Sequence, residues 1–104
     1  MGSSKKVKSF EDLKVWQSAR KLRNNIFVLT KDLPDEERYR LKDQLIRASR
    51  SVTANIAEGY GRFHYQEYIQ YCRQARGSVY EVLDHLICAK GQNFISSEEV
   101  EEFR

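Results

Sequence analysis

The chain has 104 residues, of which 40% are hydrophobic and 32% are charged, and its formal net charge is +3. This length allows one domain at most, and the composition is typical of a folded soluble protein rather than of a disordered chain. No stretch approaches the roughly 18 consecutive apolar residues of a membrane span. The lysines of MGSSKKVKSF precede no apolar segment, which argues against a secretory signal. We therefore expect a cytoplasmic protein without membrane contact.

The basic residues are concentrated in the first part of the chain. Residues 1–62 hold fourteen Lys and Arg against eight Asp and Glu, whereas residues 63–104 hold four against seven. Such asymmetry could steer a polyanion to one side of the molecule, or it could let copies of the chain attract each other. Composition does not choose between the two.

Residues 1–8 are predicted to be a disordered basic tail or a cloning remnant, and residues 9–104 one helical domain. The first helix is expected to begin at Ser9, which has capping-box spacing to Asp12, and to end before Pro34. Its apolar face recurs at helical spacing. The face comprises Val15, Trp16, Ala19, Leu22, Ile26, Phe27 and Leu29.

The second helix is predicted from about Asp35 to Glu58, because three acidic residues at its start suit the helix dipole. Its apolar stripe comprises Leu41, Leu45, Ala48, Val52 and Ile56. The third helix is predicted from Tyr65 to Lys90, with Gly91 as its C-terminal cap. Its aligned residues are Tyr65, Tyr68, Cys72, Ala75, Val79, Val82, Leu83 and Leu86.

A fourth helix is predicted after Ser96, which forms a second capping-box pattern with Glu99. Only about two turns remain before Arg104. The expected fold is therefore all-α, an up-and-down antiparallel four-helix bundle with a short or truncated fourth helix.

The stretch SVTANIAEGYGR contains a Gly-x-Gly, which raises the question of a phosphate loop. The third glycine of that motif is replaced by His64, and a helix rather than a strand precedes it, so the motif fails in sequence and in context. A turn explains the stretch better. We expect Gly59 to take a positive φ at the helix end and Gly61 to let the chain reverse. Small residues before Gly59 should allow a neighbouring helix to approach closely.

Three segments carry a resemblance to a known family: FEDLKVWQSAR, LPDEERYRLKDQLIRASRSVTANIAEGYGR and EYIQYCRQARGSVYEVLDHL. Together they resemble the small four-helix-bundle proteins encoded by intervening sequences in large-subunit ribosomal RNA genes. Accessory variability determinant proteins of diversity-generating retroelements are related to that family. In this chain Thr53 stands where proline is common, and the fourth helix is shorter than in the family.

The resemblance implies a cyclic homo-oligomer, namely a homopentamer, with a basic surface suited to nucleic acid. In the retroelement relatives the pentamer partners a reverse transcriptase and its RNA. The family offers no catalytic residues to carry over, and we expect neither a cofactor nor a metal. Cys72 and Cys88 lie sixteen residues apart on one predicted helix, about 24 Å, which is too far for a disulfide.

Candidate nucleic-acid-binding residues lie on the second helix, on the side opposite its apolar stripe. Arg40, Arg47 and Arg50 could meet successive phosphates there. The alternative is a solvated face, because Asp43 and Glu58 share it. The basic tail and the resemblance favour nucleic-acid binding over a solvated face. The predicted set is Arg40, Arg47, Arg50, Arg62, Tyr60, Phe63, Lys5, Lys6 and Lys8, with Tyr60 and Phe63 as the stacking candidates.

Other residues suggest contacts between copies. Arg23 interrupts the apolar face of the first helix, where it needs a partner, an edge between chains, or room to extend to solvent. The third helix has a second apolar edge, wider than three helices and a short fourth one need to bury. The predicted oligomer interface comprises Arg23, Ile69, Arg76, Tyr80 and Ile87.

These observations favour a non-enzymatic, homo-oligomeric protein that binds nucleic acid, most simply RNA. The main alternative is an accessory scaffold that partners a reverse transcriptase in a diversity-generating retroelement. A third hypothesis is a small hydrolase built on His64 with Glu67, or on Glu81 with His85. No nucleophile is aimed at either pair, and we predict no catalytic residue.

Overall fold

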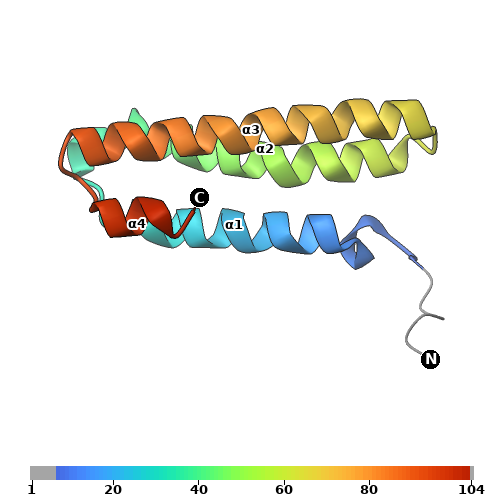
Figure 1. Ribbon diagram of the computed structural model, residues 1–104, viewed down its shortest axis with the longest axis horizontal. Coiled ribbons are helices and arrows are strands. Elements are labelled where there is room, and N and C mark those ends of the chain that lie inside the picture. The colour runs from blue at the N-terminus through green and yellow to red at the C-terminus, as the bar shows by residue number, and fades with distance from the viewer. Residues whose placement is uncertain (1–6, 104) are drawn as a thin grey trace.

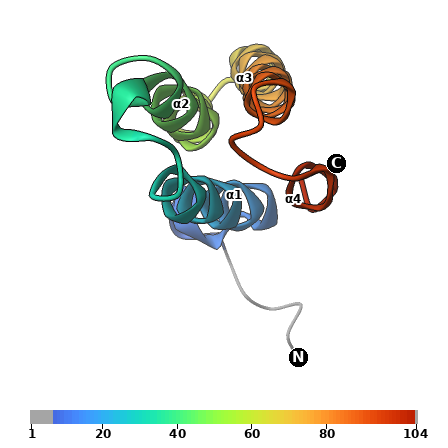
Figure 2. The ribbon, with the colours of Figure 1, turned by 90° about the vertical axis from the view of Figure 1, so that its left-hand side faces the viewer.

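The computed structural model describes residues 7–103 and consists of helices joined by short turns, with no strand in that range (Figure 1). The helices are α1 (Lys14–Thr30), α2 (Leu41–Gly61), α3 (Tyr65–Gly91) and α4 (Ser97–Glu101). Viewed along the molecule, the four occupy the corners of a square in which α1 is diagonal to α3 and α2 to α4 (Figure 2). The predicted all-α bundle is confirmed for the single chain.

The first helix begins later than predicted. The capping box at Ser9 is present, but it caps a single 3-10 turn, η2 (Phe10–Asp12). Leu13 then takes an extended conformation (φ −73°, ψ 129°), which interrupts the helix before α1 begins. The interruption turns the Phe10 ring back onto the Trp16 ring, edge to face at 5.3 Å between centroids. Packing on a large aromatic residue therefore overrides continuity of the helix.

The second helix also begins later than predicted. Asp35–Glu37 form a 3-10 turn, η3, and the backbone of Arg40 (φ −121°, ψ −104°) breaks the path before α2. The Glu37 side chain supplies the missing cap, because its Oε1 accepts a hydrogen bond from the Leu41 N–H at 3.3 Å. Arg40 consequently lies in the turn before α2 and not on its outer face. At the other end α2 extends past Glu58 to Gly61.

The predicted positive φ of Gly59 is wrong. In the described residues no glycine has a positive φ, and the left-handed positions are Phe63 (φ 61°) and Asn93 (φ 64°). Gly59 lies inside α2, where a Cβ atom would stand 2.7 Å from the Cβ of Tyr71 on α3. This glycine is required for the close approach of α2 and α3 rather than for a turn. That approach confirms the expectation that small residues bring a neighbouring helix close.

The core follows the predicted stripe of α2, all five of whose residues are buried. One hydrophobic cluster is built around Ile26, Leu45, Leu86 and Val100, and a second around Trp16. The predicted faces of α1 and α3 were too wide. Side chains that proved exposed on them are Val15, Phe27, Tyr65 and Val79.

The fourth helix is short, and its capping box between Ser96 and Glu99 is confirmed. Val100 anchors it in the core with only 2% of its surface exposed. In Figure 1, α4 lies beside one end of α1, and no other helix of residues 7–103 lies beside the N-terminal half of α1 at that corner. Among residues 7–103 no helix is both long and apolar enough to cross a lipid bilayer.

Candidate nucleic-acid interface

Three of the predicted arginines are paired with carboxylates close by in the sequence. Arg47 Nε lies 3.0 Å from Asp43 Oδ2, and Arg62 Nη2 lies 2.8 Å from Glu58 Oε2, each one helical turn away. Arg40 Nη1 lies 3.9 Å from Glu37 Oε2, a longer contact. These neighbouring carboxylates therefore neutralise part of the positive charge of the three arginines.

Arg62 is held most firmly of the three. Its Nη2 donates to Glu58 and also to the Tyr71 hydroxyl at 2.9 Å, and its guanidinium lies over the Tyr71 ring. The hydrogen bond to Glu58, together with Tyr71, raises the pKa of Arg62 above its ordinary value. This network ties the end of α2 to α3, so Arg62 has a structural role beside any binding role.

Arg50 and Arg23 lie in a different environment. Both line two adjoining hollows between α1 and α2, of about 210 and 570 Å³. Arg23 Nη1 donates to Thr53 Oγ1 at 3.1 Å across the helix pair. Within residues 7–103, no carboxylate forms an ion pair with either arginine. The partner that Arg23 was expected to need is a hydroxyl rather than an acid.

A third arginine, Arg20, belongs to the same surface. The guanidinium carbon of Arg20 lies 5.4 Å from the centroid of the Trp16 ring, and that of Arg23 lies 6.0 Å from it. Trp16 is 7% exposed, so it is itself fixed by the core. A cation held against an aromatic face keeps its charge and loses some of its freedom. We call Arg20, Arg23 and Arg50 the arginine cluster.

Sequence reasoning missed Arg20 and assigned Trp16 to the core alone. The signal was available, because Arg20 and Arg23 follow Trp16 by four and seven residues and therefore share its side of the helix. The contact of Arg23 with Thr53 had no local signal, since thirty residues separate them.

The arginine cluster can bind an anion by its chemistry. Guanidinium groups donate paired hydrogen bonds that match two oxygens of a phosphate. Among residues 7–103 no side chain accepts a hydrogen bond from the Arg50 guanidinium, and the Arg50 backbone O accepts from Thr53 Oγ1. Thr53, Ala54 and Ala57 line the larger hollow beside the arginines, so no bulky side chain of α2 obstructs it there. A phosphate backbone could thus approach the cluster along the α1–α2 surface.

The remaining predicted binding residues are spread out. Phe63, in its left-handed conformation, is 87% exposed, whereas Tyr60 is half-buried. Lys8 is exposed, and its backbone N–H donates to Asp12 Oδ2 at 2.8 Å. Lys5 and Lys6 lie outside the described residues. Phe63 therefore remains the better placed of the two stacking candidates.

The predicted interface residues of α3 lie on its outer edge. Tyr80 is 66% exposed, Ile87 and Arg76 are also exposed, and Ile69 is half-buried. Their role between copies stays a prediction. On the same helix, His85 Nε2 lies 3.3 Å from Glu81 Oε2. Among residues 7–103 no three His, Cys, Asp or Glu side chains form a group that could hold a metal ion.

Comparison with known proteins identifies the family. The model of the 23S rRNA-intervening sequence protein family matches residues 11–104, nearly the whole chain, so the protein belongs to that family. No curated protein sequence matches the chain significantly. The relation to accessory variability determinant proteins, and with it a reverse-transcriptase partner, stays a prediction.

Proposed function

We propose that this 23S rRNA-intervening sequence protein binds RNA through the arginine cluster between α1 and α2. The observation that carries the proposal is the contrast in pairing. Arg40, Arg47 and Arg62 face carboxylates, whereas the three guanidiniums of the cluster face an indole ring, a hydroxyl and open hollows. Family membership supplies the expected context, a ribosomal RNA.

The cluster would recognise the RNA backbone rather than its sequence. Arginines on a helix surface bind phosphate oxygens, and each neutralised phosphate releases counterions, so affinity falls as salt rises. For a single strand the slope of log affinity against log salt is about −0.7 per phosphate, and about −0.9 for a DNA duplex. Phe63 could add a base stack at the end of the bundle.

We further propose that the protein acts as a cyclic homo-oligomer, a pentamer by the resemblance described above. Several copies of a weak phosphate site on one assembly would bind a long RNA far more tightly than one copy does. The exposed apolar residues on the edge of α3 support the idea of contact between copies. Sedimentation velocity on the purified protein tests it, and a monomer at all concentrations would contradict it.

RNA binding is tested by fluorescence anisotropy with a structured RNA, from low to physiological salt. The variant is Arg23→Gln/Arg50→Gln, and the matched control is Arg40→Gln/Arg47→Gln, which removes the same charge from the paired arginines. Each lost phosphate contact should flatten the salt slope by about 0.7 to 0.9. We expect the first variant to lose up to two such contacts, with helicity unchanged, and the control to stay near the native slope.

Two results would count against the proposal. Equal weakening in both variants would mean that RNA responds to net charge and not to the arginine cluster. A native protein that binds no RNA even at low salt would rule out RNA binding by the protein alone.

A further inference from the structure

The smaller of the two hollows beside the arginine cluster contains an exposed aromatic ring. Phe27 lines this hollow of about 210 Å³ together with Arg23 and Arg50, and 47% of its surface is exposed. Although Phe27 shares the predicted apolar face of the first helix, it belongs to neither hydrophobic cluster of the core. The ring is therefore available to a ligand that enters the hollow.

The groups that line or flank this hollow follow one face of α1. In chain order they are Arg20, Asn24, Phe27 and Lys31, three or four residues apart. Residues at this spacing lie on the same side of a helix, and the whole stripe is about 16 Å long at 1.5 Å per residue. At its far end, Lys31 Nζ lies 5.2 Å from the centroid of the Phe27 ring. Basic groups with an aromatic ring between them are typical of surfaces that bind a single strand of nucleic acid.

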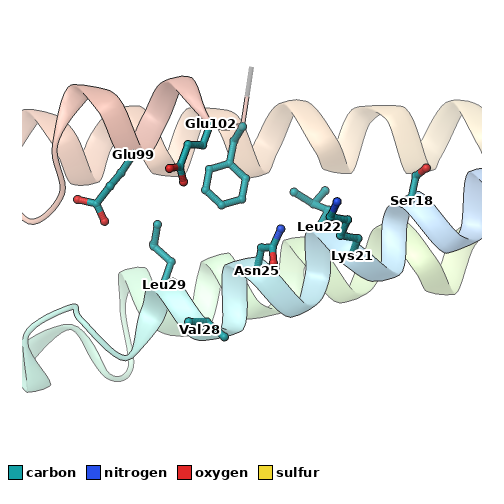
Figure 3. Close-up of a pocket in the computed structure, with 9 residues that line it drawn as sticks. Ser18, Lys21, Leu22, Asn25, Val28, Leu29, Glu99 and Glu102 are labelled. Atoms are coloured by element: carbon teal, nitrogen blue, oxygen red, sulfur yellow. The ribbon is translucent and has the colours of Figure 1, made fainter.

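No carboxylate competes with a ligand for this hollow. Among residues 7–103, no Asp or Glu lines it, and no carboxylate forms an ion pair with Lys31. The hollow between α1 and α4 is larger, about 580 Å³, but Glu99 and Glu102 line it (Figure 3). Those carboxylates would repel a phosphate. Of the two hollows, the one beside Phe27 is therefore the one that suits RNA.

The size of the hollow limits the part of an RNA that can enter it. About 210 Å³ is less than the roughly 300–1,000 Å³ of pockets that hold drug-sized ligands, so the hollow admits one base rather than a base pair. The bases of an RNA duplex are stacked inside it, whereas unpaired bases can be splayed out onto an aromatic side chain. A duplex and a single strand could both bring a phosphate to the arginines. Only an unpaired base could stack on Phe27.

We propose that the protein selects unpaired RNA by stacking one base on Phe27 while Arg23 and Arg50 bind the adjoining phosphate. This inference rests on the proposed function, because it takes RNA binding by the arginine cluster as its premise. The exposed Asn24 amide can donate to or accept from the edge of the base, and Lys31 can bind the next phosphate along the strand. Every base has a face that stacks, so the RNA is selected for an unpaired segment rather than for a particular sequence.

The test uses three fluorescein-labelled RNA probes of about 12 nucleotides. The first is an unstructured single strand, the second is the same strand in a fully paired duplex, and the third is an abasic strand of the same length and charge. Phe27→Leu removes the ring and keeps an apolar side chain, whereas Phe27→Trp keeps an aromatic ring. Tyr39→Leu is the matched control, because Tyr39 is an exposed ring beside Arg38 that lines neither hollow.

We expect the native protein to bind the single strand about tenfold more tightly than the abasic strand, as for the stacking of one base. Phe27→Leu should remove that difference and leave the affinities for the duplex and the abasic strand unchanged. Phe27→Trp and Tyr39→Leu should keep it. Circular dichroism and sedimentation velocity establish whether each variant has the native helicity and the native assembly.

The possible failures are distinguishable. If the native protein binds the single and abasic strands equally, or if Phe27→Leu keeps the native difference, the stacking site is wrong while RNA binding by the arginines stands. If Phe27→Leu changes the assembly, Phe27 is a contact between copies and the inference is likewise overturned. If the native protein binds none of the three probes at low salt, both this inference and the proposed function are wrong.

Discussion

The outer side of α2 and the α1–α2 surface both carry arginines, yet they present different charges to a ligand. On the outer side Arg47 follows Asp43 by four residues, and at the end of α2 Arg62 follows Glu58 by four, so each forms an ion pair with a carboxylate one helical turn earlier. At the α1–α2 surface, Arg20 follows Trp16 by four residues and Arg50 follows Ile46. Whether an arginine is free to bind a ligand therefore depends on the residue one helical turn before it, because an acidic residue at that position forms an ion pair with the arginine.

The largest effect on RNA affinity is expected for Arg50→Glu, which removes the difference in pairing between the two surfaces. The new carboxylate would line the same hollows as Arg23 and could form an ion pair with it. The arginine cluster would then be paired with a carboxylate, as Arg47 is on the outer side of α2. Because a hydrogen bond to a charged group contributes about 1.5–3 kcal/mol, we expect RNA affinity to fall roughly 10- to 100-fold at low salt. Fluorescence anisotropy measures the loss.

The control for this prediction is Arg47→Glu, which changes the net charge equally one turn earlier on α2. It should weaken RNA binding less than about threefold, because Arg47 is already paired with Asp43. Equal losses in the two variants would show that the two surfaces do not differ toward RNA.

A smaller effect is expected for Thr53→Val, which removes the hydroxyl that positions Arg23. Valine keeps the shape of threonine, but Arg23 loses its acceptor on α2. A net hydrogen bond contributes about 0.5–1.5 kcal/mol, so RNA affinity should fall about threefold. Thr53→Ser keeps a hydroxyl and should bind as the native protein does. The proposed positioning role fails if Thr53→Ser and Thr53→Val bind RNA equally weakly.

The sequence predicts the local features of this fold and misses those that depend on packing. The stripe of α2 and both capping boxes are set by residues three to seven positions apart, and they were found correctly. The late starts of α1 and α2 depend on Phe10 packing on Trp16 and on Glu37 capping Leu41. Neither outcome follows from helix propensity.

The candidate site divides in the same way. The spacing of Asp43 and Arg47 predicts their ion pair. That pairing favours Arg50 over Arg47 as the residue free to bind a phosphate. The hydrogen bond from Arg23 to Thr53 joins two helices and needs the fold. Gly59 was predicted to form a turn, but its lack of a side chain allows the close approach of α3 instead.

Asp43→Asn tests the same contrast between paired and unpaired arginines, because it frees Arg47 from its carboxylate. RNA affinity should rise about twofold, since a released arginine can neutralise part of one more phosphate. The free energy of unfolding should fall by about 0.3–0.5 kcal/mol, as for the loss of an exposed i,i+4 pair. Asp84→Asn makes the same charge change on the exposed side of α3 and should leave RNA affinity unchanged. A gain of equal size in both variants would attribute the effect to net charge alone.

The smallest effect is expected for Arg40→Gln. The Arg40 side chain is mostly exposed, and its contact with Glu37 is long, so its removal should change the free energy of unfolding by only about 0.2 kcal/mol. Glu37→Ala should cost more, about 1 kcal/mol, because Glu37 caps the start of α2. Arg40 precedes α2 and does not line the α1–α2 hollows, so RNA affinity should stay within about 1.5-fold of native. Urea unfolding and anisotropy measure the two quantities. A tenfold loss of RNA affinity in Arg40→Gln would place the RNA at the turn before α2, where pairing with a carboxylate would then not limit binding.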